Sequence, residues 1–348
     1  MSEKQFDQNM IVSPNIQRDG IKFYNADDPG FKMYGVWRDG DRYFRIRQSA
    51  ADLVSPGISA SADTTAGGRV RFSTDSPYVA LHVALDKLYQ YTGMAYTATC
   101  GLDVYDGNEF VGTVRPNVDT KSEIVEGIFY FENHGTHNVT VNLPLYCAVR
   151  DIFIGLDGGS SVTEPAPYKH EKPVVFYGSS ITNGACASRP GLTYEAMIAR
   201  ELDFNHHNLG FGGLAKGEMA MADYIAGLEM SAFVMDYDHN APNTEHLLAT
   251  HEPFFKRIRE SHPDIPILFI SGPRLKSGAD REARKDAIRR TYDNAVAAGD
   301  KNVYILYGDS FFDEIGWNFT VEGTHPNDLG FWFMAKGIAP VIKTMLEG

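Results

Sequence analysis

Cysteine is scarce in this 348-residue chain, which contains only Cys100, Cys147 and Cys186. Three widely spaced cysteines are too few for a disulfide framework or a cysteine-based zinc site, and we interpret them as structural thiols in a reducing compartment. No His-Glu-x-x-His motif or similar ligand spacing takes their place. We therefore expect no metal site and no cofactor.

Positive charge is also in deficit. The chain has 32 Lys and Arg residues against 45 Asp and Glu residues, which gives a formal net charge of -13 at pH 7. A chain of this charge repels a phosphate backbone, and no dense run of Lys and Arg neutralises one locally. Nucleic acid is therefore not an expected partner.

Long apolar runs are missing as well. No run approaches the length needed to cross a membrane, and residues 1–10 lack the apolar core of a signal peptide. We expect a cytoplasmic protein that does not bind membranes, although an upstream segment outside this sequence would reverse the localisation. The oligomeric state has no signature in the sequence.

The remaining composition is that of a folded protein, with 43% hydrophobic and 12% aromatic residues. A chain of this length is long for a single core, so we expect two domains. Residues 1–157 contain short β-rich runs separated by turn residues and predict a β-sandwich. The expected strands lie near residues 69–73, 78–85, 127–132 and 138–143. Asp106-Gly107 and His134-Gly135 are expected hairpin tips.

A Gly-, Ser- and Pro-rich stretch at residues 158–170 predicts a linker. In residues 171–348, apolar strands alternate with helical patterns. The strands are expected near 173–178, 206–210, 231–237, 265–271 and 302–307, and the helices near 192–203, 217–227, 244–261, 279–298 and 327–346. This alternation predicts an α/β fold whose parallel sheet is covered on both faces, with ligands at the carboxyl ends of the strands.

Ser180 stands where the first of these strands runs into a tight turn, and His325 lies in a polar segment far downstream. A serine hydroxyl is a poor nucleophile until a nearby base takes its proton, and a strand-to-helix turn can expose it at the sheet edge. The two residues together suggest a serine hydrolase.

Four segments carry a family resemblance. They are residues 178–184 with Ser180, 208–213 with Gly213, 236–240 with Asn240, and 322–328 with His325. In this order they resemble the four blocks of the SGNH (GDSL-type) hydrolases, named for Ser, Gly, Asn and His. Upstream, Gly101-Leu102-Asp103-Val104-Tyr105 is similar to the Gly-x-Asp-Leu-Tyr signature of the β-sandwich domain that precedes one branch of the family, with Val in place of Leu.

The resemblance implies a three-layer α/β/α, flavodoxin-like catalytic domain after a jelly-roll-like sandwich. It implies Ser180 as nucleophile and His325 as general base. The oxyanion hole would consist of the backbone N–H groups of Ser180 and Gly213 and the side-chain amide of Asn240. Such fixed donors suit acyl transfer, in which negative charge develops on a carbonyl oxygen.

Glu322 departs from the family pattern, in which the acid three residues before the histidine is usually Asp. Its extra methylene moves the carboxylate by roughly 1.5 Å unless the backbone compensates. We expect Glu322 to complete a triad of altered geometry, while a Ser-His dyad oriented by a backbone carbonyl stays open.

A rival motif is Gly210-x-Gly212-x-x-Ala215, which matches a permissive dinucleotide fingerprint. It follows the second strand of the domain rather than the first, and we therefore give it little weight.

The resemblance suggests a serine esterase for short acyl esters, most simply acetate on a carbohydrate, with a small-molecule or oligosaccharide ester as substrate. Several aromatic residues of the first domain could stack on sugar rings, although such residues more often form core; they are Tyr34, Trp37, Tyr89, Tyr91 and Tyr96. Two alternatives stay open: an acyltransferase that uses the same acyl-enzyme, and a carbohydrate-binding protein with a decayed site.

Overall fold

The computed structural model describes residues 4–7, 10–12, 16–117, 122–273 and 279–348. The amino-terminal segment used for the signal-peptide expectation lies partly outside these residues. Two compact units make up the chain: Met1–Phe44 with Asp63–Pro167, and Arg45–Ala62 with Tyr168–Gly348. The first unit is thus interrupted by residues 45–62, whereas we expected one continuous domain over residues 1–157.

Two antiparallel sheets form most of the first unit. One has the strand order β11-β8-β13-β3, and the other the order β10-β9-β12-β7-β14 with β4 also paired to β7. The first contains β3 (Ile21–Asn25), β8 (Tyr78–Leu85), β11 (Ile124–Tyr130) and β13 (Val149–Asp157). The second contains β4 (Lys32–Tyr34), β7 (Arg69–Thr74), β9 (Leu102–Asp106), β10 (Glu109–Val114), β12 (His137–Asn142) and β14 (Val162–Thr163). Smaller elements are β1 (Lys4–Asp7), β2 (Met10–Val12), β5 (Trp37–Asp39), β6 (Arg42–Phe44) and α3 (Tyr96–Thr99).

The core of this unit lies between the two sheets. Val79, Leu81 and Val83 alternate along β8 and pack in one buried cluster with Val139 and Val141 of β12. Residues two apart on a strand share a face, so the period-2 apolar pattern puts both inner faces in contact. The predicted β-sandwich is therefore confirmed.

The two expected hairpin tips have different outcomes. Asp106-Gly107 connects β9 to β10, which pair with each other. His134-Gly135 connects β11 to β12, but β11 pairs with β8 and β12 pairs with β7 and β9. The second prediction was wrong because a turn signal does not show whether the next strand stays in the same sheet. The linker prediction also differs from the structure, since β14 (Val162–Thr163) pairs with β7 inside that stretch.

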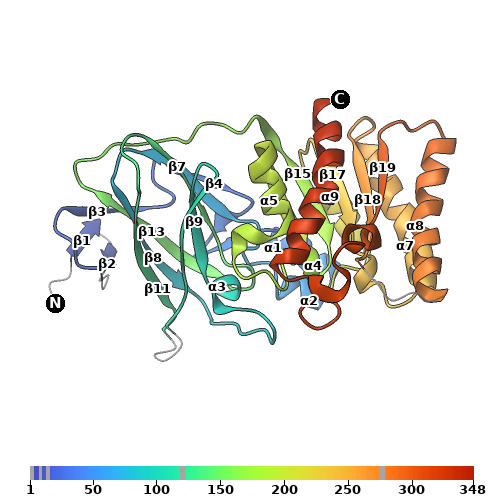
Figure 1. Ribbon diagram of the computed structural model, residues 1–348, viewed down its shortest axis with the longest axis horizontal. Coiled ribbons are helices and arrows are strands. Elements are labelled where there is room, and N and C mark those ends of the chain that lie inside the picture. Colours follow the sequence, from blue (N-terminus) through green and yellow to red (C-terminus); the bar gives the residue numbers. More distant parts are fainter. Residues whose placement is uncertain (1–3, 8–9, 13–15, 118–121, 274–278) are drawn as a thin grey trace. The chain divides into compact units, whose positions relative to one another are not determined.

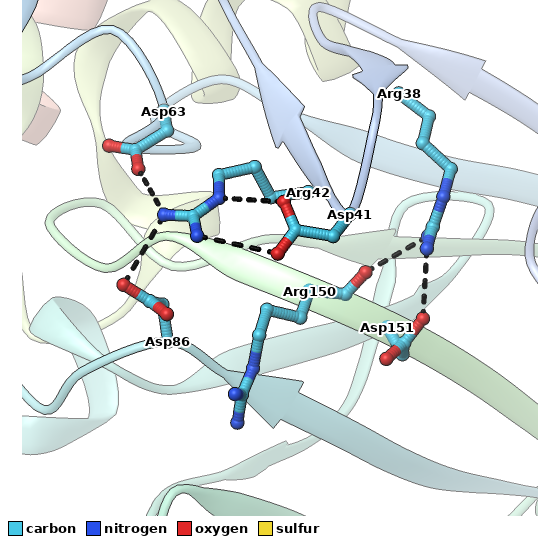
Figure 2. A network of polar contacts seen from close by, with 7 residues as sticks. All are labelled: Arg38, Asp41, Arg42, Asp63, Asp86, Arg150 and Asp151. Atoms are coloured by element: carbon cyan, nitrogen blue, oxygen red, sulfur yellow. Dashed lines mark hydrogen bonds and ion pairs between the residues drawn. The ribbon is translucent and has the colours of Figure 1, made fainter.

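An ionic network surrounds the β5–β6 hairpin (Figure 2). Arg42 Nη1 lies 3.1 Å from Asp63 Oδ2 and 3.3 Å from Asp86 Oδ2. Arg38 Nη2 lies 3.0 Å from Asp151 Oδ1. Arg42 and Asp63 stand at the two points where the chain leaves and re-enters the first unit, so their ion pair fixes both ends of the excursion over residues 45–62.

The second unit contains a five-stranded parallel sheet of order β16-β15-β17-β18-β19. Its strands are β15 (His170–Gly178), β16 (Phe204–Gly210), β17 (Ala232–Asp236), β18 (Ile267–Ser271) and β19 (Val303–Tyr307). Its α-helices are α1 (Gln48–Val54), α2 (Pro56–Ser59), α4 (Ser180–Asn183), α5 (Tyr194–Leu202), α6 (Met219–Ala226), α7 (Thr244–Ser261), α8 (Ala279–Ala297) and α9 (Asp328–Glu347). Helix α5 lies beside α9 (Figure 1), while α7 packs against both α6 and α8. This is the predicted three-layer α/β/α arrangement.

The strand order reverses at β15, which has β16 on one side and β17 on the other. In open parallel sheets, ligands bind beyond the carboxyl ends of the strands at such a switch point. Gly178 at the end of β15 is in register with Gly210 of β16 and Asp236 of β17. The loops that follow these three strands therefore start at one place on the sheet edge.

Helix α9 is the one helix among the described residues that is long and apolar enough to cross a membrane by length and composition. It packs against α5. Phe331, Met334, Ile338 and Ile342, three or four residues apart, are fully buried. Spacing of this kind is typical of a core helix with one apolar face.

Candidate active site

The turn that carries Ser180 is shaped by small residues. The side chain of Ser179 caps α4 by accepting a hydrogen bond from the Ile181 N–H, and Gly184 ends the helix at a φ of 103°. A Cβ at Gly178 would lie 2.6 Å from the Asp236 carbonyl oxygen, so only glycine fits at the end of β15. The turn leaves Ser180 half-buried at the first position of α4.

The structure brings Ser180, His325 and Glu322 together in one line of hydrogen bonds. Ser180 Oγ lies 2.8 Å from His325 Nε2, and His325 Nδ1 lies 3.0 Å from Glu322 Oε1. A carboxylate only accepts, so Nδ1 carries the ring proton and Nε2 is left to accept from the serine hydroxyl. This tautomer is the one in which a histidine can take the serine proton.

Glu322 reaches the histidine because the loop between them is tightly wound. Its Oε1 also accepts hydrogen bonds from the backbone N–H groups of Thr324 at 3.1 Å and His325 at 2.9 Å. Gly323 between them has a φ of 92°, in the left-handed region that glycine enters without strain. The side chain of Glu322 is 48% exposed, whereas that of His325 is 13% exposed. The longer acid is thus accommodated by its own loop.

Gly213 and Asn240 are also brought together, but they bind each other. The Gly213 N–H donates to Asn240 Oδ1 at 3.1 Å, and Asn240 Nδ2 donates to the Phe211 carbonyl at 2.9 Å. An amide nitrogen has two hydrogens, so one of them remains for a ligand. The Gly213 N–H is engaged in this conformation, which the sequence did not predict.

A buried polar network that the sequence did not indicate lies behind the turn. Asn208 Nδ2 donates to Glu195 Oε1 at 2.7 Å and to the Thr182 carbonyl at 2.6 Å, and Asn208 Oδ1 accepts from the Gly210 N–H at 2.8 Å. One side chain thus connects α4, α5 and the end of β16. The signal that could have indicated it was the position of Asn208 in the same segment as Gly213.

Two acids in this region have perturbed pKa values. Burial raises the pKa of Glu195 to about 7, although its hydrogen bond with Asn208 opposes the shift. Burial, together with the charge of Asp238, raises the pKa of Asp236 well above its usual range. Asp236 Oδ2 accepts hydrogen bonds from the Thr182 and Tyr194 hydroxyls at 3.1 and 3.2 Å. Burial thus favours the neutral form of both acids behind the turn.

Arg45, the first residue of the 45–62 segment, also supports the site, and the sequence did not reveal this. Arg45 as a whole is 1% exposed. Its guanidinium donates from Nη1 to the Gly210 carbonyl at 2.6 Å and lies 4.1 Å from the centre of the Phe211 ring. The Arg45 carbonyl oxygen lies 2.6 Å from His207 Nε2. These contacts fix the backbone that leads into Gly212 and Gly213.

The family matches agree with this geometry. Residues 171–343 match the model of the GDSL-like lipase/acylhydrolase family, and residues 21–162 match the GxDLY model, the N-terminus of SGNH-hydrolase-type esterases. The chain belongs to the GDSL-like lipase/acylhydrolase family. The membership makes it an esterase.

Solved structures resemble this acylhydrolase over both units. A protein from Bacteroides ovatus described as a GDSL-like lipase is 27% identical, with a TM-score of 0.84 and coverage of 94% of this chain and 98% of that chain. The salicylyl-acyltransferase SsfX3 from a tetracycline biosynthetic pathway is 21% identical, with a TM-score of 0.78 and coverage of 95% and 99%. An acetyl xylan esterase from the rumen bacterium Butyrivibrio proteoclasticus is 14% identical, with a TM-score of 0.59 and coverage of 94% and 99%. At 21% and 14% identity, the similarity to the acyltransferase and to the acetyl xylan esterase shows the fold alone. No curated protein matches the sequence.

One group of side chains in this acylhydrolase has the donor types of a metal site. Cys186, Glu322 and His325 each offer one ligand atom, and the three atoms lie within 4.8 Å of one another. Burial and the charge of Glu322 raise the pKa of Cys186 to about 12, so without a cation the thiol is protonated. The sequence did not indicate this group because its cysteine lies far from the other two residues along the chain.

Proposed function

We propose that the chain hydrolyses short acyl esters, in the first place acetate esters on carbohydrates, through an acyl-enzyme on Ser180. The observation that carries this proposal is the 2.8 Å contact between Ser180 Oγ and His325 Nε2, with Nδ1 oriented by Glu322. A nucleophile, a base and an orienting acid in hydrogen-bond reach are the recurrent arrangement of serine acyl transfer.

In the first half-reaction, Ser180 Oγ attacks the ester carbonyl carbon while its proton passes to His325 Nε2. The Glu322 carboxylate stabilises the imidazolium that forms. The tetrahedral intermediate then collapses, and the same proton goes to the oxygen of the departing alcohol. The alcohol leaves, and the acyl group stays on Ser180.

In the second half-reaction, water attacks the acyl-enzyme and gives its proton to His325 Nε2. The intermediate collapses to the free acid as His325 returns this proton to Ser180 Oγ. Both halves place negative charge on the carbonyl oxygen. The remaining Nδ2 hydrogen of Asn240 and the N–H of Ser180, which has no intrahelical partner in the first turn of α4, are suited to hold that charge. Each such donor contributes about 3 to 4 kcal/mol in comparable sites.

The carbohydrate assignment rests on the similarity of both units to enzymes that act on acetylated polysaccharides, represented by the acetyl xylan esterase. In the first unit, Tyr34 is buried and therefore unsuited to stacking on a sugar, whereas Tyr89 is 45% exposed and stacks on Tyr146 at a centroid distance of 5.9 Å. An exposed tyrosine face of this kind suits a sugar ring.

Acyl transfer to an alcohol other than water is the second candidate, and the similarity to the salicylyl-acyltransferase SsfX3 favours it. Both reactions share the acyl-enzyme and differ in what attacks it. The intact line from Ser180 to Glu322 supports either reaction over the alternative of a binding protein with a decayed site.

The test is a panel of acetylated mono- and oligosaccharides, together with p-nitrophenyl acetate, butyrate and octanoate, assayed for released acid with and without added sugar acceptors. Hydrolysis predicts acetate release that acceptors do not reduce, and a preference for acetyl over octanoyl esters. Transfer predicts acylated acceptor at the expense of free acid. No turnover of any ester by the wild type, with Ser180→Ala as the blank, would refute both.

A further inference from the structure

Cys186 has no part in the chemistry above, yet it is fixed beside it. Its N–H donates to the Pro326 carbonyl at 2.9 Å, and the Ser188 N–H donates to Asp328 Oδ1 at 2.8 Å. These two bonds connect the segment after α4 to the segment that carries His325. The thiol is therefore held next to the imidazole by backbone geometry.

The three donors are of the types that zinc prefers. Thiolate, imidazole and carboxylate bind Zn²⁺ at about 2.0 to 2.3 Å, so donor atoms around a tetrahedral ion lie roughly 3.3 to 3.6 Å apart. The donor atoms of Cys186, Glu322 and His325 are within 4.8 Å of one another, and the carboxylate belongs to a side chain that is 48% exposed. The donor atoms therefore need to approach one another by no more than about 1.5 Å to reach these ligand distances.

We propose that Cys186, Glu322 and His325 form an inhibitory site for Zn²⁺ or another thiol-binding divalent cation, with water as the fourth ligand. The ion replaces the hydrogen bond between Glu322 Oε1 and His325 Nδ1, the ring nitrogen that faces the carboxylate. Hard cations such as Mg²⁺ prefer oxygen ligands and do not compete for this site.

Inhibition follows from the proton balance. The Cys186 thiol releases one proton to solvent when its sulfur binds the ion. The proton on His325 Nδ1 is displaced and moves to Nε2, which then carries the only ring hydrogen. A protonated Nε2 cannot accept the proton of Ser180 Oγ, so the nucleophile stays inactive while the ion is bound.

Binding can be measured without turnover. In Ser180→Ala, which removes no ligand, titration calorimetry with Zn²⁺ should give one ion per chain, and Co²⁺ should produce a thiolate-to-metal charge-transfer band. The double variant Ser180→Ala/Cys186→Ser should lose the band and bind Zn²⁺ at least tenfold more weakly. Equal affinity and equal spectra in the two proteins would overturn the site.

A second experiment measures inhibition, and only this experiment rests on the proposed function. Zn²⁺ should inhibit p-nitrophenyl acetate hydrolysis by the wild type, Mg²⁺ should not, and a chelator should restore the rate. The concentration for half-inhibition, measured for each variant against its own ion-free rate, should rise at least tenfold in Cys186→Ser and Cys186→Ala.

The matched control is Cys100→Ser, a buried free thiol of the first unit, which should be inhibited like the wild type. Inhibition of both Cys186 variants at the wild-type concentration would overturn the inhibitory role. A wild type without turnover would refute the proposed function, while the binding arm would still decide the metal site.

Discussion

Gly210→Ala is a single methyl group added where the nucleophile turn meets the next strand. A Cβ at this position would lie 2.6 Å from the Thr182 carbonyl carbon and 2.9 Å from the Asn183 Cα, and closer still to the Asn183 nitrogen. These are backbone atoms of α4, so no side chain can rotate away. An ordinary contact begins at 3.4 Å, so β16 and α4 must separate by roughly 1 Å.

We expect this separation to lower both stability and rate. Overpacking of this kind costs about 1 to 3 kcal/mol, which corresponds to a Tm decrease of about 2 to 12 °C for a domain of this size. A displacement near 1 Å between the serine and its partners lowers kcat by about 10²-fold. The assay is p-nitrophenyl acetate kinetics with thermal unfolding of the same samples. Gly227→Ala is the control, because its nearest contact would be an ordinary 3.4 Å to the Tyr224 carbonyl. A Gly210→Ala protein with wild-type kcat and Tm would refute the account of how the turn is held.

Three further substitutions test other parts of the site. Glu195→Gln should flatten the pH dependence of stability. In the wild type, folding raises the pKa of Glu195 to about 7 from 4.5, so the folded protein retains a proton that the unfolded chain loses. The free energy of unfolding of the wild type should therefore fall by about 3 kcal/mol as the pH rises between these values. Thermal unfolding from pH 4.5 to 8 measures this, and equal slopes in the two proteins would contradict it. Glu322→Asp should lower kcat about tenfold, because the carboxylate retreats by roughly 1.5 Å from its 3.0 Å contact with His325 Nδ1. Glu322→Gln should lower kcat further, up to about 10⁴-fold. An unchanged kcat in both variants would show that the acid does not orient His325. Arg45→Met should lower kcat/KM by about 10- to 100-fold, because it removes the charged hydrogen bond to the Gly210 carbonyl. Arg47→Met, at an exposed position, is the control and should leave kcat/KM unchanged. Equal kcat/KM values in the two variants would refute a positioning role for Arg45.

The second unit could be predicted closely because its central strands, such as β17 and β18, are buried on both faces. Apolar runs indicated β15, β17, β18 and β19, whereas β16 contains two histidines and two asparagines. Helix α7 begins and ends at the predicted residues 244 and 261. The short helix α4 was missed because four residues carry no periodic pattern.

The excursion over residues 45–62 could not be predicted from the sequence. Its two short helices give no composition change, and the partners of Arg45 lie some 165 positions later in the chain. Local pattern shows which residues form an element but not which distant surface the element covers. Glu195 illustrates the same limit, because an acid in the first turn of an amphipathic helix is usually solvated.

For the site, the sequence predicted which residues would meet but not all of their bonds. Ser180, His325 and Glu322 lie in the expected line. The mutual hydrogen bond of Gly213 and Asn240 depends on loop geometry that no local pattern encodes. Their catalytic roles, like that of the triad, stay predictions until variants are measured.

The central claim is that His325 activates Ser180 as a nucleophile, and covalent labelling tests it most directly. A fluorophosphonate should add one equivalent to the wild type, and peptide mass spectrometry should place it on Ser180. Ser180→Ala should take up no label, and His325→Ala should be labelled at least about 10³-fold more slowly. Label on another residue, or labelling of Ser180 at the wild-type rate in His325→Ala, would contradict the account.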